Sequence, residues 1–294
     1  MTEFDEFSLL GENASEAGLT DRRPTVGRTS IGLDDGRELS AIVWGDGPPE
    51  LVLIHGGAQN AHTWDTFALA LDRPVIALDL PGHGRSSWRE DGRYRPSSMA
   101  RDVAVAVRAL APSAAAVVGM SLGGLTAIAL SAASPELVRR LVLVDITPGV
   151  DATKSAAIVN FVAGPPTFAS FDELLARTVA FNPTRSEQSL RRGLLHNAVE
   201  LDDGTWAWRH HMGRGGTSSE PGDFGALWDD VGRIAVPLML VRGSTSPVVD
   251  DADVAELMRR CPHARVDVVA DAGHSVQGDQ PVVLASLVDD FANH

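Results

Sequence analysis

Gly119-Met120-Ser121-Leu122-Gly123-Gly124 separates a strand-like apolar run, Ala115 to Val118, from an Ala- and Leu-rich segment of helical period. The stretch fits the pattern G-x-S-x-G. A sharp turn from strand to helix holds the serine Oγ clear of the backbone, and glycine on both sides removes the Cβ clashes that such a turn would cause. The helix N-terminus that follows favours a developing negative charge. The motif therefore predicts Ser121 as a nucleophile.

Apolar runs of strand length alternate with helical patterns on both sides of this motif. The alternation is typical of βαβ units, and uninterrupted apolar runs indicate strands that are covered on both faces. We therefore expect an α/β fold with a mostly parallel central sheet flanked by helices. The expected strands are 51–54, 75–78, 115–118, 141–144, 238–241 and 266–269, and the expected helices are 99–110, 122–133, 252–260 and 281–291.

The segment from Thr147 to Gly232 interrupts this alternation. It contains no strand-like apolar run, and Gly, Pro, Trp, Arg and His are plentiful in it. We expect helices over 171–180 and 186–196 and interpret the segment as a cap, with ordinary loop and helix filler as the alternative. Trp206 and Trp208 are expected to help select the acyl group, and the Gly-rich stretch 213–216 follows them.

The expected division of the chain is an N-terminal arm over residues 1–23, a core over 24–146 and 233–294, and the cap over 147–232. The arm is acidic and carries no clear period, so we expect it to be loosely attached. A chain of 294 residues with 44% hydrophobic residues can bury a large core as one globular unit. Its oligomeric state is left open.

Charge and composition exclude several classes of protein. A formal net charge of -14 repels phosphate backbones and anionic lipids, so we expect no nucleic acid partner. The pairs Arg191-Arg192 and Arg259-Arg260 are interpreted as solvated helix charges. The start of the chain lacks the pattern of a secretory signal, and no apolar stretch predicts membrane insertion, so a cytoplasmic location is expected. The single Cys261 permits no internal disulfide and is interpreted as a packing residue.

Two Gly-rich loops follow strands upstream of the serine. His55-Gly56-Gly57-Ala58 can point a backbone N–H at a carbonyl oxygen, so Gly57 N–H and Leu122 N–H are the predicted oxyanion hole. A purely structural turn is the alternative. The second loop, Asp79 to Ser86, is interpreted as a rigid loop whose polar side chains hold the neighbouring turns, and His83 is given no catalytic role.

His274 is the predicted general base. Ala272-Gly273-His274-Ser275 follows the last expected strand and precedes the last helix, so a loop at the strand end can deliver the imidazole to the serine. A lone histidine is more often a surface or structural residue, but its place after the serine and the final strand favours catalysis. Four other histidines remain possible substrate contacts: His62, His196, His210 and His211.

These motifs together resemble the α/β-hydrolase superfamily over nearly the whole chain after Pro24. The likeness is closest to capped mycobacterial serine esterases of that superfamily. It rests on the His55 loop and on three further stretches: Gln59 to Asp65, Gly119 to Thr126 and Gly273 to Gln277. The resemblance implies hydrolysis of small acyl esters beneath a cap. It does not identify the natural substrate, because this fold hosts many reactions.

The acid of the triad departs from the commonest pattern of the superfamily. That pattern places it near the third residue after a glycine at the end of the penultimate strand, where this chain has Ser246. Asp145, at the end of the strand that follows the nucleophile helix, matches the place where some members carry their acid, and is the predicted acid. Asp250 and Asp251 are the alternative, although an aspartate directly before a helix is most simply an N-cap.

The predicted reaction is acyl transfer to Ser121 followed by hydrolysis, on a small-molecule ester, with no metal or organic cofactor. The sequence contains no G-x-G-x-x-G opening a βαβ unit, no P-loop and no His/Cys cluster at metal-ligand spacing. Two alternatives remain at this point: a carbon–carbon bond hydrolase or another non-ester reaction using the same triad, and a non-catalytic ligand receptor built on the fold.

Overall fold

An eight-stranded sheet forms the centre of the computed structural model, which describes residues 5–214 and 224–294. Its strand order is β1-β2-β4-β3-β5-β6-β10-β11, antiparallel at β1–β2 and β2–β4 and parallel from β4 onward. The strands are β1 (Val26–Gly32), β2 (Glu38–Trp44), β3 (Leu51–Ile54), β4 (Val75–Leu78), β5 (Ala116–Met120), β6 (Leu141–Val144), β10 (Leu238–Gly243) and β11 (Arg265–Val269).

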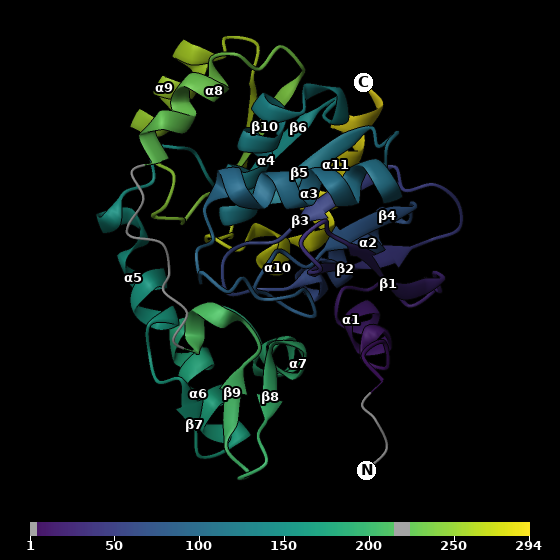
Figure 1. Ribbon diagram of the computed structural model, residues 1–294, viewed down its shortest axis with the longest axis vertical. Coiled ribbons are helices and arrows are strands. Elements are labelled where there is room, and N and C mark those ends of the chain that lie inside the picture. The colour runs from purple at the N-terminus through teal and green to yellow at the C-terminus, as the bar shows by residue number, and fades with distance from the viewer. Residues whose placement is uncertain (1–4, 215–223) are drawn as a thin grey trace.

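Helices cover both faces of this sheet (Figure 1). One apolar cluster joins the sheet to α3, α4, α8 and α9, and a second joins it to α1, α2, α10 and α11. Strands β3, β4, β5 and β6 are buried along their whole length, which is why they are continuous apolar runs. These helices are α1 (Leu10–Glu16), α2 (Asp65–Leu71), α3 (Pro96–Leu110), α4 (Leu122–Ala133), α8 (Leu227–Val231), α9 (Asp251–Arg260), α10 (Val276–Asp279) and α11 (Pro281–Asn293).

The expected fold class is confirmed, and every strand expected from an apolar run is present within one or two residues. The antiparallel edge formed by β1 and β2 was not expected. Strand β1 is only partly buried and carries Arg28, Thr29 and Ser30, so its sequence lacks the apolar run of a strand covered on both faces.

The insertion between β6 and β10 packs mainly on itself. It contains α5 (Ala152–Val162), α6 (Phe171–Phe181), α7 (Glu187–Asn197) and a three-stranded sheet in the order β7-β9-β8, from β7 (Thr167–Phe168), β8 (Ala198–Glu200) and β9 (Trp206–Trp208). The sequence pattern did not reveal these strands, because strands of two or three residues are too short to form an apolar run. In Figure 1 the part of the insertion that holds α6, α7 and the small sheet lies below the main sheet.

The aromatic side chains of the insertion fill its own small core. Trp208 is buried and packs edge-on against Phe161 and Phe168, and Trp206 packs against Phe171. Helix α8 is different, because Trp228 and its neighbours pack with the helices of the main sheet. The separately packed part of the insertion therefore runs from α5 to β9. Of the Gly-rich stretch 213–216, residues 215 and 216 lie outside the described residues.

The described part of the N-terminal arm, residues 5–23, packs against the rest of the chain, contrary to the expectation of a loose attachment. Ala14 of α1 is buried in the cluster beneath the sheet, and Glu16 accepts hydrogen bonds from Ser186 Oγ at 2.6 Å and from Arg192. The interpretation of Arg192 as a solvated charge is also wrong, since this side chain of α7 is buried against α1.

Within residues 5–214 and 224–294 no helix is long and apolar enough to cross a membrane.

Candidate active site

Ser121 stands at a strained turn between β5 and α4. Its backbone has φ 50° and ψ -120°, a conformation that costs a non-glycine residue about 1–3 kcal/mol unless its surroundings hold it. The surroundings do so by close packing: a Cβ on Gly119 would lie 2.5 Å from Gly123 O, and a Cβ on Gly123 would lie 2.3 Å from Ile54 O. The two glycines therefore let α4 begin directly against the strand ends.

His274 lies between the serine and a buried carboxylate. Its Nε2 is 3.0 Å from Ser121 Oγ, and its Nδ1 is 2.8 Å from Asp145 Oδ2. Asp145 follows β6, and His274 lies in the loop between β11 and α10. Because β5, β6 and β11 are parallel, their carboxyl ends share one edge of the sheet, which brings the three side chains together.

Two donors from the end of β10 hold Asp145 in place. Gly243 N–H donates to Asp145 Oδ1 at 2.9 Å, and the Ser246 hydroxyl donates to Asp145 Oδ2. Asp145 is fully buried, so it would be costly to leave its charge without such partners. Ser246 occupies the position that holds the acid in the commonest pattern, and here its hydroxyl donates to the carboxylate that follows the neighbouring strand β6.

The alternative acids are engaged elsewhere. Asp250 caps α9 by accepting from Asp253 N–H at 2.9 Å, as an aspartate before a helix is expected to do. Asp251 accepts from Arg242 Nη1 at 2.6 Å, and its side chain is 97% exposed. Of the three candidates, Asp145 is the one whose carboxylate contacts His274.

The loop after β3 lies against the turn that carries Ser121. A Cβ on Gly57 would be 3.7 Å from Leu122 Cδ2, and one on Gly56 would be 3.2 Å from Ser121 Cβ. Gly56 N–H donates to Gln59 Oε1 and Ala58 N–H donates to His83 Nε2. Among the described residues, the N–H groups of Gly57 and Leu122 have no hydrogen-bond acceptor.

The loop from Asp79 to Ser86 holds its neighbours, as expected. Buried Asp79 accepts from Ala61 N–H at 2.7 Å and from Arg85 N–H at 3.0 Å. Burial lowers the pKa of His83 well below its usual range, so its neutral ring can accept the hydrogen bond from Ala58 N–H. His83 therefore serves the loop that carries Gly57.

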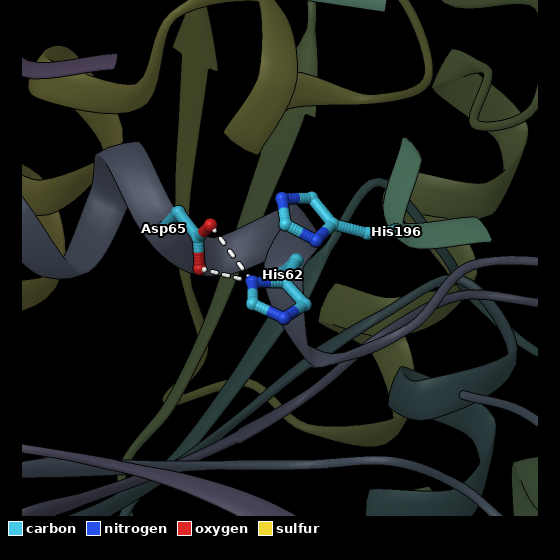
Figure 2. A group of neighbouring side chains, drawn as sticks. All are labelled: His62, Asp65 and His196. Carbon is cyan, nitrogen blue, oxygen red and sulfur yellow. Dashed lines mark hydrogen bonds and ion pairs between the residues drawn. The ribbon is translucent and has the colours of Figure 1, made fainter. Parts of the chain in front are cut away.

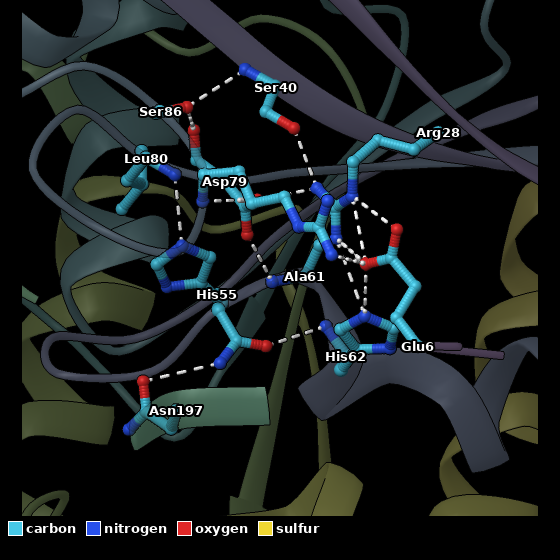
Figure 3. A network of polar contacts seen from close by, with 12 residues as sticks. Glu6, Arg28, Ser40, His55, Ala61, His62, Asp79, Leu80, Ser86 and Asn197 are labelled. Carbon is cyan, nitrogen blue, oxygen red and sulfur yellow. Dashed lines mark hydrogen bonds and ion pairs between the residues drawn. The ribbon is translucent and has the colours of Figure 1, made fainter. Parts of the chain in front are cut away.

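A partly buried ionic network surrounds His62 (Figure 3). His62 lies 3.0 Å from Asp65 through Nδ1 and 3.0 Å from Glu6 through Nε2, and Glu6 also pairs with Arg28 at 2.7 Å. Burial lowers the pKa of His62, but Asp65 and Glu6 outweigh burial and raise it to about 9. His62 therefore carries a charge at neutral pH.

His62, Asp65 and His196 also form a group whose ligand atoms lie within 4.8 Å of one another (Figure 2). The two imidazoles are stacked, with ring centroids 3.7 Å apart and an angle of 12° between their planes. Ring nitrogens bind a metal in the plane of the ring, so two nearly parallel stacked rings cannot both direct a lone pair at one ion without turning. Burial and the His62 charge lower the pKa of His196 to about 3. The arrangement fits an imidazolium stacked on a neutral imidazole.

We expect the contribution of His62 to the free energy of unfolding to fall as the pH rises from about 6.5 to about 9. The total should fall above about pH 7.5, where the histidines whose pKa is lowered are neutral in both the folded and the unfolded state. His62 keeps its proton to about pH 9 when folded, whereas an unfolded histidine loses it near pH 6.5. The stabilisation is complete below the unfolded pKa and is lost as the pH rises through the folded one, at up to about 1.4 kcal/mol per pH unit. Urea unfolding across this range measures the slope. The variant His62→Gln should flatten this slope, whereas His294→Gln, at an exposed position, should not. Equal slopes in the wild type and both variants would refute the raised pKa of His62.

The other histidines proposed as substrate contacts have structural partners. His210 is buried, and burial lowers its pKa to about 3. His211 Nδ1 accepts from the Tyr94 hydroxyl at 2.7 Å, and its ring stacks on Trp88 with centroids 4.3 Å apart. These contacts join the insertion to the loop that follows β4.

Known proteins resemble this chain along its length. The family described as alpha/beta hydrolase fold matches residues 49–281. Esterase Rv0045c of Mycobacterium tuberculosis is 47% identical over 295 residues, which cover 98% of this chain and 96% of that relative. Its crystal structure matches with a TM-score of 0.88 and covers 100% of both chains. The sn-1-specific diacylglycerol lipase ABHD11 of Xenopus laevis is 30% identical over 256 residues, 83% of this chain and 80% of the relative. The likeness to the esterase spans the sheet and the insertion alike.

Proposed function

Because this chain belongs to the α/β-hydrolase fold family, we propose that it hydrolyses small carboxylic esters through an acyl-enzyme on Ser121. Its 47% identity to an esterase over almost the whole chain makes it a carboxylic-ester hydrolase. What we propose beyond this is which residues perform the reaction. It rests above all on His274, which lies 3.0 Å from Ser121 Oγ and 2.8 Å from Asp145 Oδ2.

In the first stage, Ser121 Oγ attacks the ester carbonyl and His274 Nε2 takes its proton. The carbonyl oxygen becomes an oxyanion, which the N–H groups of Gly57 and Leu122 stabilise. These groups suit the role because they lie on facing turns and have no acceptor among the described residues. The alcohol leaves with the proton that His274 returns, and the acyl group stays on Ser121.

In the second stage, His274 takes a proton from water as the water oxygen attacks the acyl carbonyl. The tetrahedral intermediate collapses, Ser121 Oγ recovers the proton, and the carboxylic acid is released. Asp145 accepts the Nδ1–H of His274 throughout, which fixes the tautomer and stabilises the imidazolium that forms in each stage. Gly243 N–H and Ser246 keep this carboxylate oriented.

We further propose that the segment 147–232 acts as a cap over this site. The contact of α7 with the loop after β3 supports the proposal, because Asn197 Nδ2 donates to Ala58 O at 2.7 Å. Trp208 is buried inside the insertion, so any influence it has on the acyl group would act through the packing of the cap.

A panel of fluorogenic short-chain esters and a fluorophosphonate tests the function. We expect turnover of the esters and a single covalent adduct, which peptide mass spectrometry places on Ser121. An adduct on Ser121 without turnover of any ester would move the chemistry to another substrate class. Turnover with the adduct on a different residue would refute the assignment of the nucleophile.

Ser246→Ala is expected to lower kcat about tenfold and to leave KM nearly unchanged. The variant removes one of two donors that orient Asp145, and a hydrogen bond to a charged group contributes about 1.5–3 kcal/mol. Steady-state kinetics on one short-chain ester measures the effect. Ser244→Ala is the matched control, because Ser244 is exposed in the same loop. Equal kcat values for the two variants would show that Ser246 has no part in catalysis.

A further inference from the structure

Helix α7 of the insertion reaches loops that carry the predicted active-site groups. At its C-terminal end, Asn197 bonds to the loop that follows β3. Just before its N-terminal end, Arg185 lies 4.0 Å from Asp279, and the same carboxylate accepts from Gly273 N–H at 2.8 Å, next to His274. One helix of the insertion is thus connected to the oxyanion loop and to the histidine loop.

Asn197 makes two side-chain hydrogen bonds across this boundary. Its Nδ2 donates to Ala58 O at 2.7 Å, and its Oδ1 accepts from Asn60 Nδ2 at 3.2 Å. Asn60 Oδ1 in turn accepts from His62 N–H at 2.9 Å, so each amide has both ends engaged. Figure 3 shows Asn197 on its own element, pointing at the loop that leads to Ala61 and His62.

Ala58 is the residue through which this contact can act on Gly57. Its φ is 61°, a left-handed conformation that a residue with a Cβ keeps only when its neighbours hold it. Its N–H is held by His83 of the core at 3.1 Å, and its C=O is held by Asn197 of the insertion. Gly57 directly precedes Ala58 in the chain. The direction of the Gly57 N–H therefore depends on the two hydrogen bonds that hold Ala58, one with His83 and one with Asn197.

The charged stack beside Asn197 helps to seat the helix end. His196 precedes Asn197 and lies on the His62 ring at 3.7 Å between centroids. His62 is in turn fixed between Asp65 and Glu6 at 3.0 Å each. The last residues of α7 are therefore held by side chains of the core and of the N-terminal arm, and these contacts fix the position from which Asn197 reaches Ala58.

We propose that Asn197 is a positioning residue for the oxyanion hole, which couples the docking of α7 to the direction of the Gly57 N–H. The inference rests on the proposed function, since it assigns Asn197 an effect on the oxyanion that forms at Ser121. When α7 is docked, Ala58 is held from both sides and Gly57 N–H points at the oxyanion position. When the Asn197 bond is lost, the left-handed Ala58 keeps its core anchor only.

Asn197→Asp tests this proposal with little change of shape. The variant replaces the Nδ2 donor by a carboxylate oxygen that faces Ala58 O, so the loop loses its anchor from the insertion. Asn182→Asp is the matched control, because Asn182 follows α6 and its Nδ2 donates to Thr178 O within the same helix end at 2.9 Å. Asn197→Ala, which removes the bonds without adding charge, is the second variant, and thermal unfolding checks that each protein is folded.

We expect Asn197→Asp and Asn197→Ala to lower kcat at least tenfold with KM changed less than twofold, because only the transition state carries the oxyanion. A trifluoromethyl ketone, which forms a tetrahedral oxyanion on the serine, should bind more weakly by the same factor as kcat/KM falls. Asn182→Asp should leave both quantities unchanged. A rise in KM at constant kcat, unchanged ketone binding, or equal effects of the Asn197 and Asn182 variants would overturn the proposal.

Failure of this inference can be told from failure of the proposed function. If Ser121→Ala abolishes ester hydrolysis while both Asn197 variants behave like Asn182→Asp, the nucleophile stands and the positioning role is refuted. If Ser121→Ala retains activity, the proposed function itself is wrong and the kinetics of the Asn197 variants cannot be assigned to an oxyanion at Ser121, so both are refuted together.

Discussion

Ser121→Ala is expected to give a folded protein whose ester hydrolysis falls by about 10⁴-fold or more. The Oγ atom is the only proposed nucleophile, and its hydrogen bond in the structure goes to His274. Alanine keeps the Cβ, so the strained turn at φ 50° meets no new clash and gains no new freedom. Steady-state rates on a short-chain ester measure the loss, and thermal unfolding should change by only a few degrees.

Labelling separates this result from a general loss of structure. The variant should also lose the fluorophosphonate adduct, because the adduct forms on the same oxygen. Ser131→Ala is a suitable control, since Ser131 is a buried serine of α4, the helix that follows Ser121, and has no place in the proposed site. Activity of Ser121→Ala near that of the wild type would remove Ser121 from the mechanism.

Asp145→Asn is expected to lower kcat by about 10³–10⁴-fold, the effect of losing the orienting acid in a serine triad. The three donors around Asp145 are His274 Nδ1, Gly243 N–H and the Ser246 hydroxyl. An asparagine offers only one oxygen and turns an NH₂ group toward at least one of these donors. His274 is then pushed toward the tautomer whose Nε2 cannot accept the serine proton. Kinetics on the same ester measures the loss.

Asp250 and Asp251 provide matched controls, because their substitution should affect stability and kcat differently from that of Asp145. Asp250→Asn and Asp251→Asn should leave kcat within about twofold, because neither side chain contacts His274. Asp250→Asn should still cost up to about 1 kcal/mol of stability, because it loses the ion pair of Asp250 with Lys154, whereas asparagine caps α9 about as well as aspartate does. The opposite ranking, with a large loss of kcat for a later aspartate and little for Asp145, would transfer the acid to that loop.

The choice between these acids shows where sequence reasoning was strong and where it needed the fold. A strand of four buried apolar residues is recognisable in isolation, so the expected ends of β3, β4 and β6 agree with the structure. The contact of Asp145 with His274 was harder to predict, because the two residues are 129 apart in the sequence and the usual position of an acid holds Ser246. Their contact follows from the order β5-β6-β10-β11, which places the ends of these strands side by side.

The N-terminal arm and the insertion were predicted less well for the same reason. Arm residues such as Glu6 and Glu16 look like ordinary solvated acids in a segment without a period. Their partners, His62 and Arg192, lie 56 and 176 residues away, and no local pattern announces such pairs. The short strands of the insertion escape detection because two or three residues show no periodicity, and they form by pairing with one another.

The sequence by itself determined the α/β fold class, the tight turn that carries Ser121 and the loop that carries His274. Each depends on residues that are neighbours along the chain: apolar runs that must be buried, and glycines without which a tight turn would clash. Only the tertiary structure decided which carboxylate meets His274, that Ser246 supports it, and that Asn197 holds Ala58 from 139 residues away. These contacts arise where separate strands and helices end side by side, and that proximity is set by packing of the whole chain.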